Sequence, residues 1–210
     1  EDGLLWAFSL RDAVWSDGRD ITAEDVVYSL RRAVDPATLA AYGDVYAPIL
    51  NAEAVMRGEA PPERLGVAAP DARTVEIRLH HPMPYLPDLL ADSRAAIVPR
   101  HAIEMHGDDW VRPENIVVSG AYTLVERAVD RQTVLLRNPL YFDDQNTCFD
   151  EVFSFPSAST ETATRRARAG ELDIAWNVPA SMLARVSEEM PGHVRVSEPP
   201  VTFYLLANTE

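Results

Sequence analysis

The sequence contains no lysine, and all nineteen of its basic residues are arginines. This absence excludes a Schiff-base lysine and the lysine of a phosphate-binding P-loop. The only cysteine, Cys148, has no partner for a disulfide within the chain, and we expect a packed or half-exposed thiol there. No run approaches the roughly eighteen consecutive apolar residues that a membrane-spanning helix needs.

Positive charge is scarce relative to negative charge. Nineteen arginines face thirty-three acidic residues, which gives a net charge of −14. Such a chain repels phosphate backbones and anionic lipid, so we expect no nucleic-acid partner and no membrane-surface binding. The 210 residues and the hydrophobic content of 47% suffice for a buried core. The chain starts without a targeting peptide, and its apolar end segments predict a piece cut from a longer protein.

Catalytic and metal-binding motifs are also missing from the sequence. It has no G-x-S-x-G, H-E-x-x-H or G-x-G-x-x-G pattern. The neighbours His80 and His81 point to opposite faces of a strand, and His101 and His106 lack the spacing of paired ligands, so solvated surface is the expected place for them. The acidic pairs at 108–109, 143–144 and 188–189 are also expected to be solvated. We therefore predict no enzyme, no cofactor and no metal.

The patterns that are present mix helices with hairpins. A capping sequence at Thr22 opens a helix that Asp35-Pro36 ends. Further helices are predicted at 48–57, at 101–106, from Ser159 to Gly170 and at 179–190. A short helix is also predicted to end at Leu90. Hairpins are predicted at 67–79, with a turn at Pro70-Asp71, and at 120–136. Strands are predicted at 4–10, 172–176 (buried), 194–196 and 201–206.

Several aromatic and amide side chains stand at the predicted ends of strands and helices. Such groups combine apolar contact with hydrogen bonding, which suits recognition of a polar organic ligand in a cleft. Each could equally be a residue at the edge of the core with one satisfied hydrogen bond. The set comprises Tyr42, Tyr46, Tyr122, Trp176, Asn177 and Asn208.

Six separate blocks of sequence resemble the extracytoplasmic solute-binding proteins of peptide ABC transporters (family 5), in the same order and spacing. The stretch DPATL at 35–39 is most similar to the oligopeptide-binding members. The blocks are LRDAVWSDG (10–18), TAEDVVYSLRRAVDP (22–36), NIVVSGAYTL (115–124), LRNPLYF (136–142), RAGELDI (168–174) and FYLLANT (203–209).

The resemblance implies a mixed α/β fold, namely a lobe similar to the type II periplasmic binding proteins with an inserted α+β subdomain, truncated at both ends. Residues 1–99 then correspond to the extra subdomain of the first lobe. Residues 100–210 correspond to the α/β subdomain that contacts the ligand, and the second lobe is missing.

The resemblance also implies the function and the site. Tyr42 and Asn177 match ligand-contacting positions, and a shift of register by one residue would involve Trp176. The expected partners are a peptide ligand and the membrane permease of an ABC transporter, and the expected location is periplasmic or extracytoplasmic, with or without a lipid anchor. Open alternatives are a ligand-sensing regulatory module and binding of dipeptides, murein peptides, nickel complexes or sugars.

Overall fold

The computed structural model describes residues 3–40 and 43–197. The contacts divide the chain into two units, 1–154 and 155–210. This division concerns compactness and does not test the subdomains expected at 1–99 and 100–210. The helices are α1 (Ala23–Val34), α2 (Ala52–Met56), α3 (Leu86–Leu90), α4 (Arg100–His106), α5 (Thr160–Arg168) and α6 (Ala180–Glu189). The strands are β1 (Leu5–Ser9), β2 (Val67–Asp71), β3 (Thr74–Arg78), β4 (Tyr122–Ala128), β5 (Gln132–Arg137) and β6 (Glu151–Ser154).

Helix α1 forms as its capping sequence predicts. The Asp25 carboxylate accepts hydrogen bonds from the backbone N–H of Thr22, at 2.9 Å, and from its hydroxyl, at 3.1 Å. Val27, Leu30 and Val34 lie one helical turn apart and are buried. The helix ends at Asp35, which has extended backbone before Pro36.

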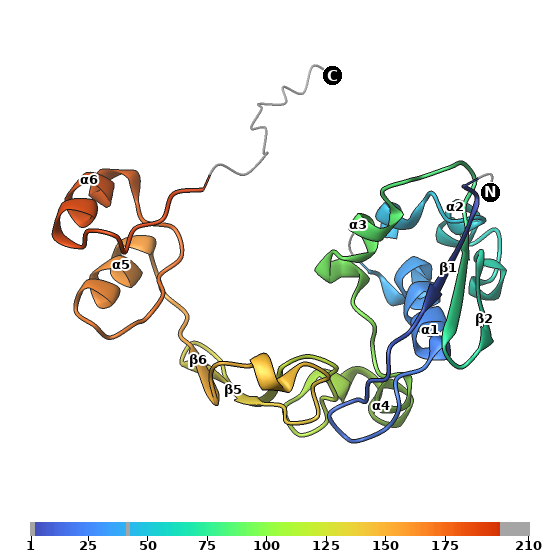
Figure 1. Ribbon diagram of the computed structural model, residues 1–210, viewed down its shortest axis with the longest axis horizontal. Coiled ribbons are helices and arrows are strands. Elements are labelled where there is room, and N and C mark those ends of the chain that lie inside the picture. Colours follow the sequence, from blue (N-terminus) through green and yellow to red (C-terminus); the bar gives the residue numbers. More distant parts are fainter. Residues whose placement is uncertain (1–2, 41–42, 198–210) are drawn as a thin grey trace, which may run out of the picture. The chain divides into compact units, whose positions relative to one another are not determined.

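The first sheet has the strand order β1-β3-β2, and all of its pairs are antiparallel. Val75 and Ile77 of β3 are buried because alternate side chains of a strand share one face. Helix α1 packs on this sheet through contacts with β2 and β3 (Figure 1). Fifteen buried residues between Ala23 and Leu86 form the resulting core.

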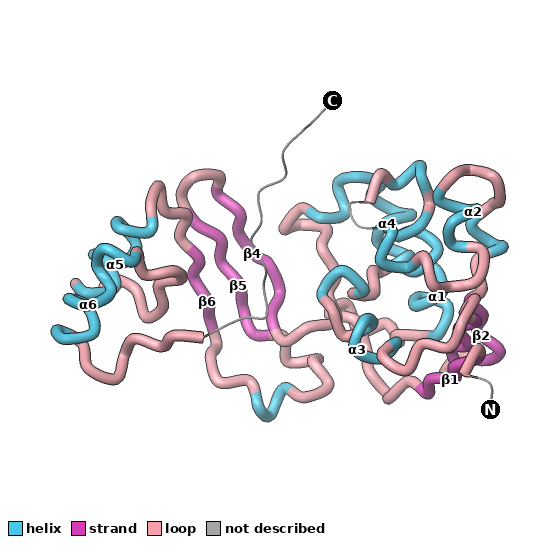
Figure 2. Tube along the Cα trace, turned by 90° about the horizontal axis from the view of Figure 1, so that it is seen from above, coloured by secondary structure: helices cyan, strands magenta, loops and turns pink. Residues whose placement is uncertain are grey.

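The second sheet has the order β4-β5-β6, again antiparallel, and Figure 2 shows its strands side by side. It contains the predicted second hairpin, with Asp130 at a φ of 58° in the turn. Among the apolar residues of its strands, only Val134 is buried.

Two local predictions in the first unit are wrong. The helix expected at 48–57 is confined to α2, because Asn51 has a φ of 66° and Leu50 donates its N–H to the carbonyl of Arg78. The expected turn at Pro70-Asp71 lies inside β2 instead. The chain reverses two residues later, where the Asp71 carboxylate accepts the N–H of Arg73 at 2.8 Å.

Candidate functional site

The loop between α5 and α6 carries two of the three predicted site residues. Trp176 is 81% exposed, and Asn177 is exposed beside it. Ile174, two residues earlier, is 69% exposed. The loop therefore presents apolar surface and an amide next to each other.

Helix α5 begins and ends where its sequence predicts. The Ser159 hydroxyl accepts the N–H of Thr162 at 3.2 Å, which caps the first turn. After the helix, Gly170 adopts a φ of 76°, a conformation that favours glycine. Arg166 pairs with Glu171 at 2.9 Å, so the start of the loop is bonded back to the helix.

An ion-pair network joins α5 to α6. Glu189 pairs with Arg168 of α5 and with Arg185 of its own helix, the latter at 2.6 Å. The hydrogen bond from Arg185, followed by the charge of Arg168, lowers the pKa of the Glu189 carboxyl. These contacts hold together the two helices that flank the loop.

The backbone of Asn177 has a left-handed conformation. Its φ is 60°, in the left-handed region that asparagine tolerates better than most residues. Within the described residues, its side-chain amide makes no hydrogen bond. An amide offers both donors and an acceptor, so it can bond to the N–H and C=O groups of an extended peptide.

Of the three predicted site residues, the structure describes Trp176 and Asn177. Tyr42 and Asn208 lie outside the described residues. Tyr46, a candidate from the same polar set as Tyr42, is a core residue whose hydroxyl donates to the carbonyl of Arg94 at 2.8 Å. Burial raises the pKa of that hydroxyl. Tyr46 is therefore a residue of the core with one satisfied hydrogen bond, as the second of the two interpretations of this set predicts, and not a ligand contact.

The strand prediction around the site is wrong. Residues 172–176 were expected to form a buried strand, but they form an irregular segment with Ile174 and Trp176 exposed. A strand is stable only when a neighbour completes its hydrogen bonds, and no described strand pairs with this segment. The same reason applies to residues 194–196, which form no strand. Residues 201–206 lie outside the described part.

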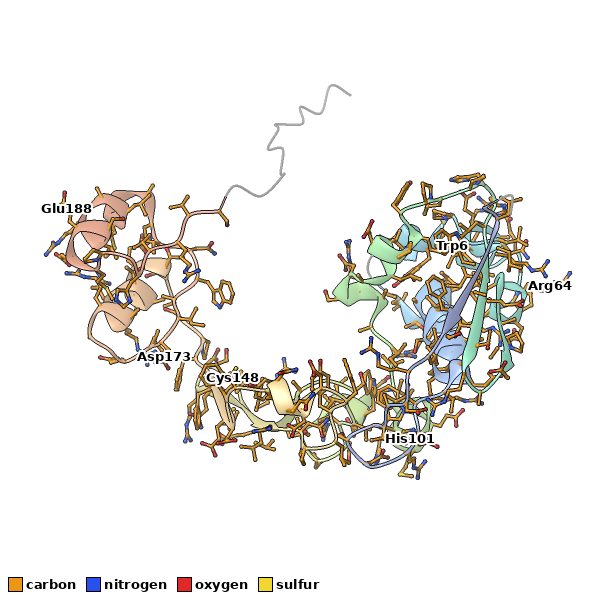
Figure 3. All side chains as sticks on the ribbon, viewed as in Figure 1. Trp6, Arg64, His101, Cys148, Asp173 and Glu188 are labelled. Carbon is orange, nitrogen blue, oxygen red and sulfur yellow. The ribbon has the colours of Figure 1, made fainter. Side chains whose placement is uncertain are left out.

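The loop at Trp15–Gly18, part of the first sequence block, has a structural role that sequence reasoning missed. Ser16 exchanges two hydrogen bonds with the backbone of Val118, at 2.8 and 3.0 Å. Asp17 bonds to the His101 ring at 2.8 Å, and the ring also meets the buried Trp15 edge-on. His101, labelled in Figure 3, is therefore only 20% exposed and not solvated as predicted.

The other polar candidates have ordinary roles. One member of each acidic pair bonds to an arginine: Asp109 to Arg112, Asp144 to Arg137 and Glu189 to Arg185. Cys148 is exposed, which differs from the expected packed or half-exposed thiol. Among the described residues, no three His, Cys, Asp or Glu side chains are grouped to hold a metal ion. No helix in the described ranges is long and apolar enough to cross a membrane.

The described residues combine helices with two antiparallel three-stranded sheets. Residues 1–210 match the family of bacterial extracellular solute-binding proteins, family 5, middle region. The chain belongs to this family, and the fold predicted from the resemblance is confirmed.

Individual relatives agree with this assignment. The chain is 38% identical to the periplasmic oligopeptide-binding protein OppA of Salmonella typhimurium, over all of this chain and 39% of that protein. It is also 38% identical to YgiS of Escherichia coli, described as a probable deoxycholate-binding periplasmic protein. That similarity covers 93% of this chain and 37% of YgiS. Haemophilus influenzae OppA in complex with the peptide RPPGFSPFR superimposes with a TM-score of 0.87 at 35% identity, covering 91% of this chain and 38% of that one. The chain thus spans about two fifths of the length of these binding proteins.

Proposed function

We propose that the protein containing this chain is the substrate-binding component of an ABC transporter. It captures oligopeptides outside the cytoplasmic membrane and delivers them to a permease. Membership of the family and the likeness to OppA support this function. The periplasmic location of the named relatives supports the proposed compartment.

The observation that carries the proposal in this chain is the exposed amide of Asn177. It projects from an exposed loop, has no hydrogen-bond partner in the described part of the chain, and has a left-handed backbone. Main-chain hydrogen bonds to a peptide do not depend on the peptide's side chains, so such a contact suits a binder of many sequences. Tyr42 and Trp176 are proposed as further contacts, with residues 100–210 as the ligand-contacting subdomain and 1–99 as the extra one.

The test compares Asn177→Gly with Asp130→Gly in the full-length protein. Glycine accepts both left-handed backbones, so only the side chains are lost. Losing the Asn177 amide leaves peptide groups unpaired in a closed site, which should weaken binding by about 5- to 150-fold for peptides of any sequence. Asp130→Gly, in the β4–β5 turn, should leave affinity unchanged.

Calorimetry with several peptides measures these affinities, and melting temperatures control for folding. Tyr42→Phe should cost less than Asn177→Gly, because it removes a single hydroxyl. Unchanged affinity of Asn177→Gly with a lowered melting temperature would show that Asn177 serves packing only.

A second candidate ligand is an amphipathic steroid such as deoxycholate. The exposed Ile174 and Trp176 beside Asn177 would give apolar contact next to one hydrogen-bonding group. The relative YgiS, named for deoxycholate, supports this candidate. Calorimetry of the full-length protein with deoxycholate tests it, and a failure of Trp176→Ala to weaken that binding would exclude the proposed contact.

A further inference from the structure

A pocket of about 320 Å³ lies against helix α1, away in sequence from the Asn177 loop. Its wall is formed by one side of α1, the segment that follows the helix, Pro62 and Glu63, and the start of α4. Its volume is at the small end of the range of ligand sites. The charged and hydroxyl-bearing residues of its wall are Glu24, Tyr28, Arg31, Arg32, Asp35, Thr38, Glu63 and Arg100.

The three arginines of this wall differ in their pairing. Within the described residues, neither Arg31 nor Arg32 makes an ion pair, whereas Arg100 bonds to Glu104 at 2.7 Å. The Nε–H of Arg31 is moreover buried without an acceptor. The Arg31 and Arg32 side chains as a whole are only half-buried, so an oxyanion in the pocket would supply the charge partner that both lack in the described ranges.

The acidic residues of the wall decide which oxyanion suits the pocket. Asp35 already accepts the N–H of Ala37 at 2.9 Å. The side chains of Glu24 and Glu63 are exposed at the wall and make no hydrogen bond or ion pair in the described ranges, while the charge of Glu24 contributes to the raised pKa of Arg100. Their charges would repel a phosphate or another polyanion but would attract an ammonium group.

We propose that this pocket binds a small zwitterion with one carboxylate and one ammonium group, such as a free amino acid or a dipeptide. The carboxylate bonds to Arg31 and Arg32, since guanidinium forks match carboxylates in geometry and charge. The ammonium group lies toward Glu24 and Glu63. Such a site is additional to the proposed peptide contact at Asn177, and either can fail without the other.

The experiment follows the arginine Nε–H resonances of the ¹⁵N-labelled full-length protein during titration with dialanine. This signal is local, so binding elsewhere in the protein does not produce it. The Arg31 resonance should shift in a saturable manner, and Arg31→Met should weaken the binding reported by Arg32 at least about tenfold. Arg31→Lys, which keeps the charge but lacks the Nε–H, should lose less.

Three further ligands and two variants complete the design. Dialanine amide, which lacks the carboxylate, should not shift Arg31, and N-acetyl-dialanine, which lacks the ammonium, should bind about threefold or more weakly. Inorganic phosphate should bind more weakly than dialanine.

Arg64→Met is the matched control, since Arg64 (Figure 3) is exposed and outside the pocket wall. Asn177→Gly should leave the titration unchanged.

Several results would overturn the proposal. These are no shift of the Arg31 resonance up to about 10 mM dialanine, equal shifts with dialanine amide, or tighter binding of phosphate. Equal losses in Arg31→Met and Arg64→Met would also contradict it. A melting temperature of each variant near that of the parent protein establishes that the loss is local.

Discussion

The two three-stranded sheets in the described part of the chain differ in how well they are covered. The sheet β1-β3-β2 is covered by α1, and its central strand contributes buried Val75 and Ile77 to a closed core. The sheet β4-β5-β6 buries Val134 alone among its apolar strand residues and leaves Phe153 50% exposed. A sheet of three strands needs a covered apolar face for independent stability. We therefore infer that the first sheet carries most of the stability of the described chain, while the second offers its surface for contacts.

The largest expected effect tests this difference with matched truncations in the full-length protein. Ile77→Ala leaves a cavity in the closed core and should lower the free energy of unfolding by about 2–5 kcal/mol. Leu136→Ala, in the second sheet at 36% exposure, should cost less than half as much. Urea denaturation followed by tryptophan fluorescence measures both. Equal costs would refute the inferred difference between the sheets.

The next largest effect concerns Ser29, whose hydroxyl connects helix α1 to the segment around Val98. The buried hydroxyl of Ser29 donates to the carbonyl of Asp25 and accepts the N–H of Val98, at 2.7 and 2.8 Å. Ser29→Ala leaves that N–H without an acceptor and should cost about 1–3 kcal/mol. The control is Ser154→Ala on the exposed end of β6, which should be close to neutral. Thermal unfolding compares the two, and a neutral Ser29→Ala would mean that residues 97–99 are held by packing alone.

A smaller effect is expected in the second unit, at the start of α5. Ser159→Ala removes the cap on Thr162 and should destabilise the helix by about 1 kcal/mol. Amide hydrogen exchange should become faster in α5 and stay unchanged in α1, and Ser159→Asp should restore protection. Faster exchange in α1 as well would show that the two units unfold together.

The smallest effect is a dependence on pH at the end of β5. The hydrogen bond that Arg137 donates to the Asp144 carboxylate lowers the pKa of this carboxyl in the folded protein. The carboxylate therefore adds stability above its unfolded pKa of about 4, and this stability is lost as the pH falls through that value toward the lowered folded pKa. Asp144→Asn should reduce the decrease in melting temperature between neutral and acidic pH. An unaltered pH profile would show that this ion pair does not contribute.

The sequence predicted well those elements whose signals are local. The capping residues Thr22 and Asp25, the buried spacing of Val27 and Leu30, and the Ser159 cap of α5 all have partners within a few residues. Helix ends and hairpins depend on such short-range hydrogen bonds, so their patterns can be read without knowledge of the fold.

The failures involve partners that are distant in sequence. An apolar alternation at 172–176 specifies a strand only if another strand lies beside it. His101 looked solvated because its partner, Asp17, is 84 residues away. The pocket at Arg31 was also missed, since the unpaired state of a guanidinium is visible only once its surroundings are known. Of the predicted site residues, the structure describes Trp176 and Asn177, whose assignment came from the resemblance.

The paired hydrogen bonds between Ser16 and Val118 have a consequence for the order of folding. They connect positions 102 residues apart, so forming them before the core would require closing a longer loop than any contact within the core does. The core between residues 23 and 86 needs shorter closures and can form first. The junction then closes onto an existing core, which makes it a late event in folding. Its loss should accelerate unfolding more than it slows refolding.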